Sequence, residues 1–131
     1  MKIARPLILS FLLCLPAVSH AQDATALAEL DASVLESLRA LGSDLKKPHQ
    51  VDFYLSFDSE AAAKAASAQA VKDGYAEIEL APSLDGEQWQ LQVQRTMVPE
   101  QTAINGVSRA FGALAQQHKG EYDGWSAVPA E

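Results

Sequence analysis

Apolar residues recur at intervals of three and four near the start of the chain and at intervals of two further on. The first pattern predicts a helix that ends at Gly42, since glycine readily adopts the backbone conformation of a C-terminal cap. Its apolar stripe consists of Leu27, Leu30, Val34, Leu38 and Leu41. The second pattern predicts a strand with one buried face. Along it, Val51, Phe53, Leu55 and Phe57 alternate with Asp52, Tyr54, Ser56 and Asp58.

The next two segments predict a helix and a second strand. Residues 60–72 are dominated by alanine, which favours a helix packed closely on a sheet, and Asp58 and Ser59 are suitable N-caps for it. Residues 75–80 alternate again and predict a strand. Its inward side chains are Ile78 and Leu80, and its outward side chains are Glu77 and Glu79.

Turn-forming residues at 82–86 predict a hairpin, so the following strand should return antiparallel. In that strand, Trp89, Leu91 and Val93 alternate with Gln88, Gln90, Gln92 and Gln94. Pro99 fits the first position of a long helix, whose positive end Glu100 would complement. One face of this helix carries Ile104, Val107, Phe111, Leu114 and His118. Gly120 ends it, and residues 125–128 predict a short last strand.

The predicted elements have a recognisable order after the opening helix: strand, helix, strand, strand, helix, strand. This order, with one layer of helices on an antiparallel sheet, predicts an α+β sandwich of ferredoxin-like topology. The sequence contains no internal repeat and no low-complexity tract. One domain is therefore expected.

The start of the chain has the pattern of a cleavable export signal. Residues 1–5 carry Lys2 and Arg5 and no acid, and residues 7–15 form an apolar run, interrupted by Ser10, that is too short to span a membrane. Cleavage is expected after Ala21. Cys14 lies within the apolar run, where a lipidated cysteine is the alternative interpretation. Leu13 stands where lipidation would need a small residue, so we expect Cys14 to be removed with the signal. The product should be exported, to the periplasm or further.

Cleavage would leave 110 of the 131 residues and change the formal net charge from −7 to −9, because Lys2 and Arg5 are removed. We expect an N-terminal extension over residues 22–30 and one domain over residues 31–131. The negative charge disfavours nucleic acid and anionic membranes as partners and favours basic proteins or cations. Charge that merely keeps the protein dispersed explains it equally well. The sequence leaves the oligomeric state open.

Three stretches together resemble the family of the ribonuclease E inhibitor RraB. They are residues 34–57 (VLESLRALGSDLKKPHQVDFYLSF), Thr96-Met97-Val98-Pro99, and Gly120-Glu121-Tyr122-Asp123-Gly124-Trp125. The resemblance covers residues 31–128 and implies a ferredoxin-like fold and regulation through protein binding. The best-known member acts in the cytoplasm, where it binds a ribonuclease and lowers its activity. An exported chain should not meet that enzyme, so the resemblance implies a protein partner without identifying it.

The sheet face away from the helices is the first candidate binding site. Strand alternation predicts on it Asp52, Tyr54, Ser56, Glu77, Glu79, Gln90, Gln92 and Gln94. Carboxylates and amides do not stack on nucleic-acid bases, so a hydrogen-bonding protein surface with Tyr54 as its aromatic anchor is the sharper interpretation. A solvated sheet face without a partner is the alternative.

The segment Tyr122-Asp123-Gly124-Trp125 is the second candidate. It fits a contact loop, or a structural unit in which Asp123 and Gly124 turn the chain while both aromatic residues pack on the sheet. The predicted partner-binding residues are therefore Asp52, Tyr54, Glu77, Glu79, Gln90, Gln92, Tyr122, Asp123 and Trp125.

Catalytic chemistry has weaker support in the sequence. His49 and His118 are not close in sequence to a plausible nucleophile, and no phosphate-binding loop, nucleophile elbow or metal-ligand spacing occurs. We expect no cofactor and no metal. The alternative function is a small envelope enzyme that uses carboxylates of the open face, such as Asp52 paired with Glu77 across strands.

Overall fold

The structure, a computed structural model, describes residues 24–130. The predicted signal peptide, with Cys14 and the cleavage after Ala21, lies outside the described residues. The described elements are α2 (Ala24–Ala40), β1 (His49–Phe57), α3 (Glu60–Lys72), β2 (Ala76–Pro82), β3 (Trp89–Met97), α4 (Gln101–Gln117) and β4 (Gly120–Ala127). None of these helices is long and apolar enough to cross a membrane.

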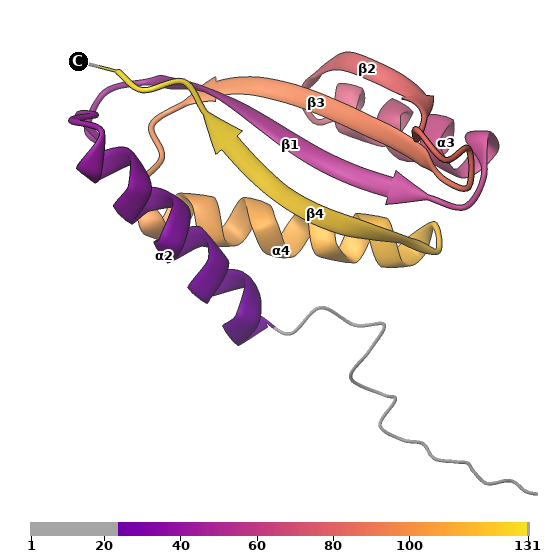
Figure 1. Cartoon of the computed structure of the whole chain (residues 1–131), viewed down its shortest axis with the longest axis horizontal. Coiled ribbons are helices and arrows are strands. Elements are labelled where there is room, and N and C mark those ends of the chain that lie inside the picture. Colours follow the sequence, from indigo (N-terminus) through magenta and orange to yellow (C-terminus); the bar gives the residue numbers. More distant parts are fainter. Residues whose placement is uncertain (1–23, 131) are drawn as a thin grey trace, which may run out of the picture.

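The four strands form one antiparallel sheet in the order β2-β3-β1-β4. Helices α3 and α4 pack on the same face of this sheet, and α2 packs against α4 and β4 (Figure 1). The predicted ferredoxin-like α+β fold, with an additional helix in front, is confirmed. We call the helix-covered side of the sheet the inner face and the opposite side the open face.

The core lies between the inner face and the helices. Every second residue of β1 from Val51 to Phe57 is at most 1% exposed, as the alternation predicts. Helix α3 can approach the sheet closely because its buried side chains are small. They belong to Ala63, Ala66, Ser67 and Ala70. Ser59 caps this helix as expected, because its side chain accepts a hydrogen bond from the Ala62 N–H.

An aromatic cluster fills the space between α4 and the sheet. The Phe111 ring lies 5.0 Å from Phe53, 4.9 Å from Tyr75 and 5.9 Å from Tyr122, measured between ring centroids. Aromatic contacts of this kind stabilise a core beyond the area that they bury. The long helix α4 is thus fixed on β1 and β4 through one central phenylalanine.

Helix α2 turns a different side to the core than its apolar stripe predicts. Leu30 and Leu41 are 58% and 70% exposed, so their predicted place in the stripe is wrong. The buried residues of the helix are Leu27, Asp31, Leu35 and Leu38. The helix thus turns Asp31 and Leu35 inward in place of Leu30.

The Asp31 carboxylate joins α2 to both α4 and β4. Its Oδ1 accepts hydrogen bonds from the Ser108 hydroxyl at 2.7 Å and from the Trp125 indole N–H at 2.8 Å. Since Ser108 has one hydroxyl proton and gives it to Asp31, the Tyr122 hydroxyl, 3.3 Å away, donates to Ser108. Both Asp31 and Ser108 are at most 2% exposed. We call these four residues the Asp31 network.

Two β-bulges interrupt the alternation of the sheet. In β2 the pairing with β3 shifts between Glu77 and Glu79, so Ile78 is an extra residue. Glu77 therefore faces inward, where it accepts a hydrogen bond from Ser67, and Ile78 is 47% exposed. The predicted outward position of Glu77 and inward position of Ile78 are wrong, whereas Glu79 and Leu80 lie as predicted.

The second bulge lies in β4, where the pairing with β1 shifts at Asp123. This strand begins at Gly120 and not at Trp125, so the predicted bounds are wrong. Asp123 and Gly124 do not turn the chain but form the bulge, which Gly124 permits by its φ of 109°. The extra residue brings both Tyr122 and Trp125 onto the inner face, where they are 3% and 7% exposed.

The entry to α4 also differs in detail from the prediction. Pro99 is buried but precedes the helix, and Glu100 takes the N-cap position without a capping side-chain hydrogen bond. The predicted first helical position of Pro99 is therefore wrong by two residues. Two of the buried residues of α4, Ser108 and Ala115, are absent from its predicted apolar face, and Ser108 is the polar one.

Gly120, at the start of β4, is needed because of a close approach to β1. A Cβ there would overlap the Phe57 ring and the Ser56 carbonyl oxygen. We expect Gly120→Ala to lower the free energy of unfolding by about 1–3 kcal/mol, as overpacking does in cores. Gly106→Ala is the matched control, because its Cβ would meet nothing nearer than Arg109 Nη2 at 4.0 Å. It should raise stability by up to about 1 kcal/mol through helix propensity. Urea unfolding measures both, and equal effects would contradict this interpretation.

Burial raises the pKa of Asp31. The hydrogen bonds from Ser108 and Trp125 and the charge of Arg109 lower it, but the effect of burial is larger. Ionisation of Asp31 is therefore less favourable in the folded than in the unfolded chain. The stability that the raised pKa of Asp31 provides is fully present below pH 3.8, the pKa of this group in the unfolded chain. It is lost as the pH rises through the higher pKa of the folded chain.

Asp31→Asn keeps an acceptor oxygen and cannot ionise. The unfolding free energy of the original protein minus that of Asp31→Asn should consequently decrease as the pH rises above 3.8. Urea unfolding of both proteins over a pH series measures this difference. A difference that is constant or increases with pH would show that Asp31 does not titrate in this way.

Candidate functional site

The open face gathers most of the predicted partner-binding residues. The strand pairing places Asp52, Tyr54, Glu79, Gln90, Gln92 and Asp123 on it, together with Ser56, Gln94, Glu121 and Ser126. No Lys or Arg occupies an open-face position in the four strands, which all belong to the described part of the chain. We call this surface the acidic sheet face.

Asp52 lies at its centre, on β1, and is only 8% exposed. Its Oδ1 accepts hydrogen bonds from the side-chain amides of Gln92 at 3.1 Å and Gln94 at 2.9 Å, both on β3. The carboxylate is thus held by neutral amides, and no Lys or Arg of the described residues forms a salt bridge with it. Two fixed glutamines leave its negative charge in place for a partner on the open side.

Tyr54 lies two residues after Asp52 on β1, and its side chain reaches β4, the strand that carries Asp123. Tyr54 is 36% exposed, and its hydroxyl shares a hydrogen bond of 3.1 Å with Ser126. Desolvation raises the pKa of Asp123, and the negative charge of Glu121 raises it further. A hydrogen bond from Ser56 acts in the opposite direction and lowers it. The bulge in β4 is what directs Asp123 to this face.

A shallow hollow runs between these side chains. It has a volume of about 140 Å³ and is lined by Tyr54, Leu55, Glu79, Gln90, Leu91, Gln92 and Asp123. Its size suits one side chain of a partner better than a separate small molecule, because small-molecule sites usually measure several hundred Å³. The hollow brings together five of the residues that the sequence predicts for partner binding.

Asp52 lies on the open face outside this hollow, and the other three predicted residues do not lie on the open face. Glu77 is on the inner face, held by Ser67, and Tyr122 and Trp125 are buried in the Asp31 network. Asp52 and Glu77 do not face each other across strands, because β3 lies between their strands. The prediction that Asp52 and Glu77 form a carboxylate pair for an enzyme is therefore wrong.

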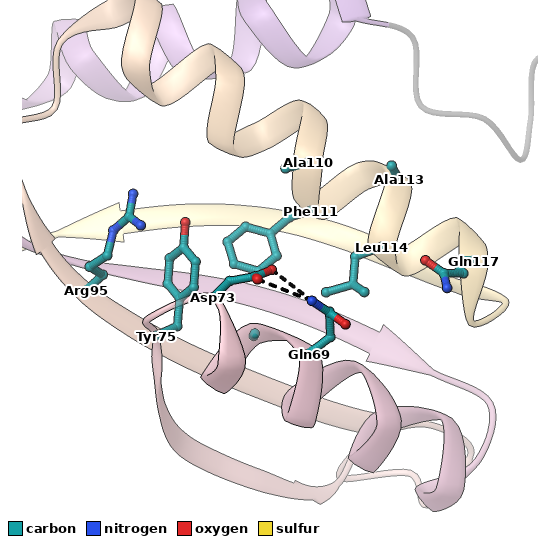
Figure 2. A pocket seen from close by; sticks show the side chains of 10 residues that line it. Gln69, Asp73, Tyr75, Arg95, Ala110, Phe111, Ala113, Leu114 and Gln117 are labelled. Carbon is teal, nitrogen blue, oxygen red and sulfur yellow. Dashed lines mark hydrogen bonds between the residues drawn. The ribbon is translucent and has the colours of Figure 1, made fainter.

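A larger cavity, of about 360 Å³, opens on the helix side between α3 and α4. Figure 2 shows Tyr75 and Phe111 next to each other there, with Arg95 beside Tyr75 and with Gln69 hydrogen-bonded to Asp73. The Arg95 guanidinium lies over the Tyr75 ring, 4.5 Å from its centroid. A cation on an aromatic face is stabilised by the ring itself, so this arrangement accounts for Arg95 without a ligand.

The two histidines of the described residues have structural environments. His49 is buried at the start of β1. Its Nε2 forms a hydrogen bond with the Ser43 hydroxyl, and its Nδ1 forms one with the Lys47 carbonyl oxygen. His118 is the C-cap residue of α4. Within residues 24–130, no three His, Cys, Asp or Glu side chains gather closely enough to hold a metal ion.

Sequence reasoning missed Asp31 and Ser108, which form a buried polar connection outside the acidic sheet face. A signal for Asp31 was present. It lies four residues after Leu27 and four before Leu35, so a polar residue occupies a position of the buried stripe. A polar residue at such a position indicates a hydrogen-bonded role in the core.

The comparisons with known proteins identify the family. Residues 28–127 match the family model described as regulator of ribonuclease activity B. A comparison with curated protein sequences gave no significant match. The matched region runs from α2 to the last residue of β4 and includes the whole sheet. With most of its length matched, the chain belongs to the regulator of ribonuclease activity B family, RraB.

Proposed function

We propose that this protein is an exported, non-catalytic regulator that acts by covering part of another protein with its acidic sheet face. Family membership supports regulation through a protein partner. The export signal expected at residues 1–21 puts that partner in the cell envelope or outside the cell. A ribonuclease of the cytoplasm is then not the partner.

The observation that carries the proposal is the one-sided charge of the sheet. The open face presents Asp52, Glu79, Glu121 and Asp123 without a basic residue among them. A surface of this kind attracts a basic patch and accelerates its encounter with the protein. Tyr54 adds an exposed aromatic ring, the residue type that often dominates binding energy in an interface.

An envelope enzyme is the alternative, in which a carboxylate of the open face performs acid-base chemistry. Asp123 has the raised pKa that such a group needs. Its surroundings favour binding instead, because Ser56 holds it and the central Asp52 is occupied by Gln92 and Gln94. The hydroxyl next to Asp123 belongs to Ser56, which is buried and so poorly placed to attack a substrate, and the hydrogen bonds to Asp52 come from amides.

The proposal predicts that charge reversal on the open face, combined with loss of the Tyr54 ring, strongly reduces partner capture. Glu79→Lys combined with Tyr54→Ala should reduce crosslinked partner by about tenfold or more, since an interface anchor is worth at least 1–2 kcal/mol. Crosslinking and pull-down from the source organism, with the full precursor carrying a C-terminal tag, measures the captured protein. Capture should also decrease as the salt concentration rises.

Glu60→Lys is the matched control, because it makes the same charge change on the exposed start of α3, away from the acidic sheet face. It should retain the partner. Equal loss in both variants would show that net charge and not this face determines capture. Undiminished capture by the double variant would refute the acidic sheet face as the binding site.

Export is tested by the N-terminus of the same tagged protein. Mass spectrometry should find a chain that begins at Gln22 in the envelope or medium fraction, because signal peptidase recognises the small residues before this position. An intact Met1 on a cytoplasmic protein bound to a ribonuclease would contradict the export part of the proposal.

A further inference from the structure

A pocket lies between the start of α2 and the bulge of β4, outside the acidic sheet face. Figure 1 shows α2 beside α4, next to β4. The pocket has a volume of about 200 Å³. Its walls include the apolar side chains of Leu27, Leu30, Val34 and Trp125, and two carboxylic acids, Asp31 and Asp123, also line it. Its composition is thus apolar along the sides with acids at two positions.

One oxygen of Asp31 lacks the partner that its burial requires. Oδ1 accepts hydrogen bonds from Ser108 and Trp125, whereas the buried Oδ2 has no hydrogen-bond partner within residues 24–130. Among the described residues, the only other buried side-chain nitrogen or oxygen in this condition is Asn105 Oδ1. Leaving a buried acceptor unpaired is unfavourable, and more so when the group is charged. A donor inside the pocket would relieve this cost.

We propose that this pocket binds the cationic side chain, lysine or arginine, of a basic protein segment. The hydrocarbon part of such a side chain fits between Leu27, Leu30 and Val34, and its charged end supplies N–H donors to Asp31. A cation also fits better than a neutral donor, because no Lys or Arg within residues 24–130 forms a salt bridge with Asp31 or Asp123, and Arg109 acts on Asp31 only through its charge. The volume admits one side chain, and it is smaller than most small-molecule sites.

Asp123 connects this pocket to the acidic sheet face. It lines both the pocket and the hollow beside Tyr54, and it lies in β4, the strand at the edge of the sheet. A basic segment on the open face can therefore pass around this edge and insert one side chain next to α2. The identity of the segment rests on the proposed function, whereas binding of the cation itself depends only on the pocket.

The test titrates the isolated full chain, labelled with ¹⁵N, with butylguanidinium, which reproduces the end of an arginine side chain. The indole N–H signal of Trp125 reports binding, because that group is bonded to Asp31. We expect a saturable shift of this signal. N-butylurea has a similar shape and no charge. It should bind at least about tenfold more weakly, as expected when a hydrogen bond between charged groups is lost.

Two variants and a control complete the experiment. Asp31→Asn should weaken butylguanidinium binding about tenfold or more, and Asp123→Asn, which leaves the Asp31 network intact, should weaken it too. Asp85→Asn removes the same charge from the exposed β2–β3 turn and should leave binding unchanged. Equal affinity for the neutral analogue, no saturable shift, or unchanged affinity in both pocket variants would overturn the proposal.

The two proposals fail separately. No partner protein is present in the titration, so its failure leaves the acidic sheet face to be tested by capture alone. If the cation binds here while Glu79→Lys combined with Tyr54→Ala captures as much partner as the unmodified chain, the pocket is retained and the acidic sheet face is refuted.

Discussion

The buried carboxylate of Asp31 holds the opening helix on the rest of the fold. One oxygen accepts hydrogen bonds from Ser108 on α4 and from Trp125 on β4. A buried indole N–H without an acceptor would cost about 1–3 kcal/mol, so α2 adopts the rotation that brings Asp31 to both donors. That rotation leaves Leu30 at the surface. The orientation of this helix thus combines a polar contact of Asp31 with the burial of Leu27, Leu35 and Leu38.

The β-bulges decide which side chains the two sheet faces present. A regular strand cannot turn two residues three positions apart to the same face, because its side chains alternate. The bulge at Asp123 turns Tyr122 and Trp125 inward together, and Trp125 thereby reaches Asp31. The same bulge places Asp123 on the acidic sheet face. Core formation and the charge of the binding surface therefore depend on one local irregularity.

The arrangement of charge connects the family assignment to the proposed mechanism. A regulator that acts by binding needs a surface that is stable without its partner. Here Gln92 and Gln94 hold Asp52, and Ser126 holds Tyr54, so little ordering is left to occur on binding. The pocket at α2 extends this acidic surface around the edge of the sheet through Asp123.

The sequence by itself determined the order of the elements, the fold and the inner face of β1, because hydrophobic periodicity and turn residues act over short distances. It also placed Asp52, Tyr54, Gln90 and Gln92 on one surface, since regular alternation is enough for β1 and β3. Only the tertiary structure decided the orientation of α2 and the sides on which the residues near both bulges lie. Those features depend on contacts between distant segments, such as Trp125 with Asp31, for which local periodicity carries no information.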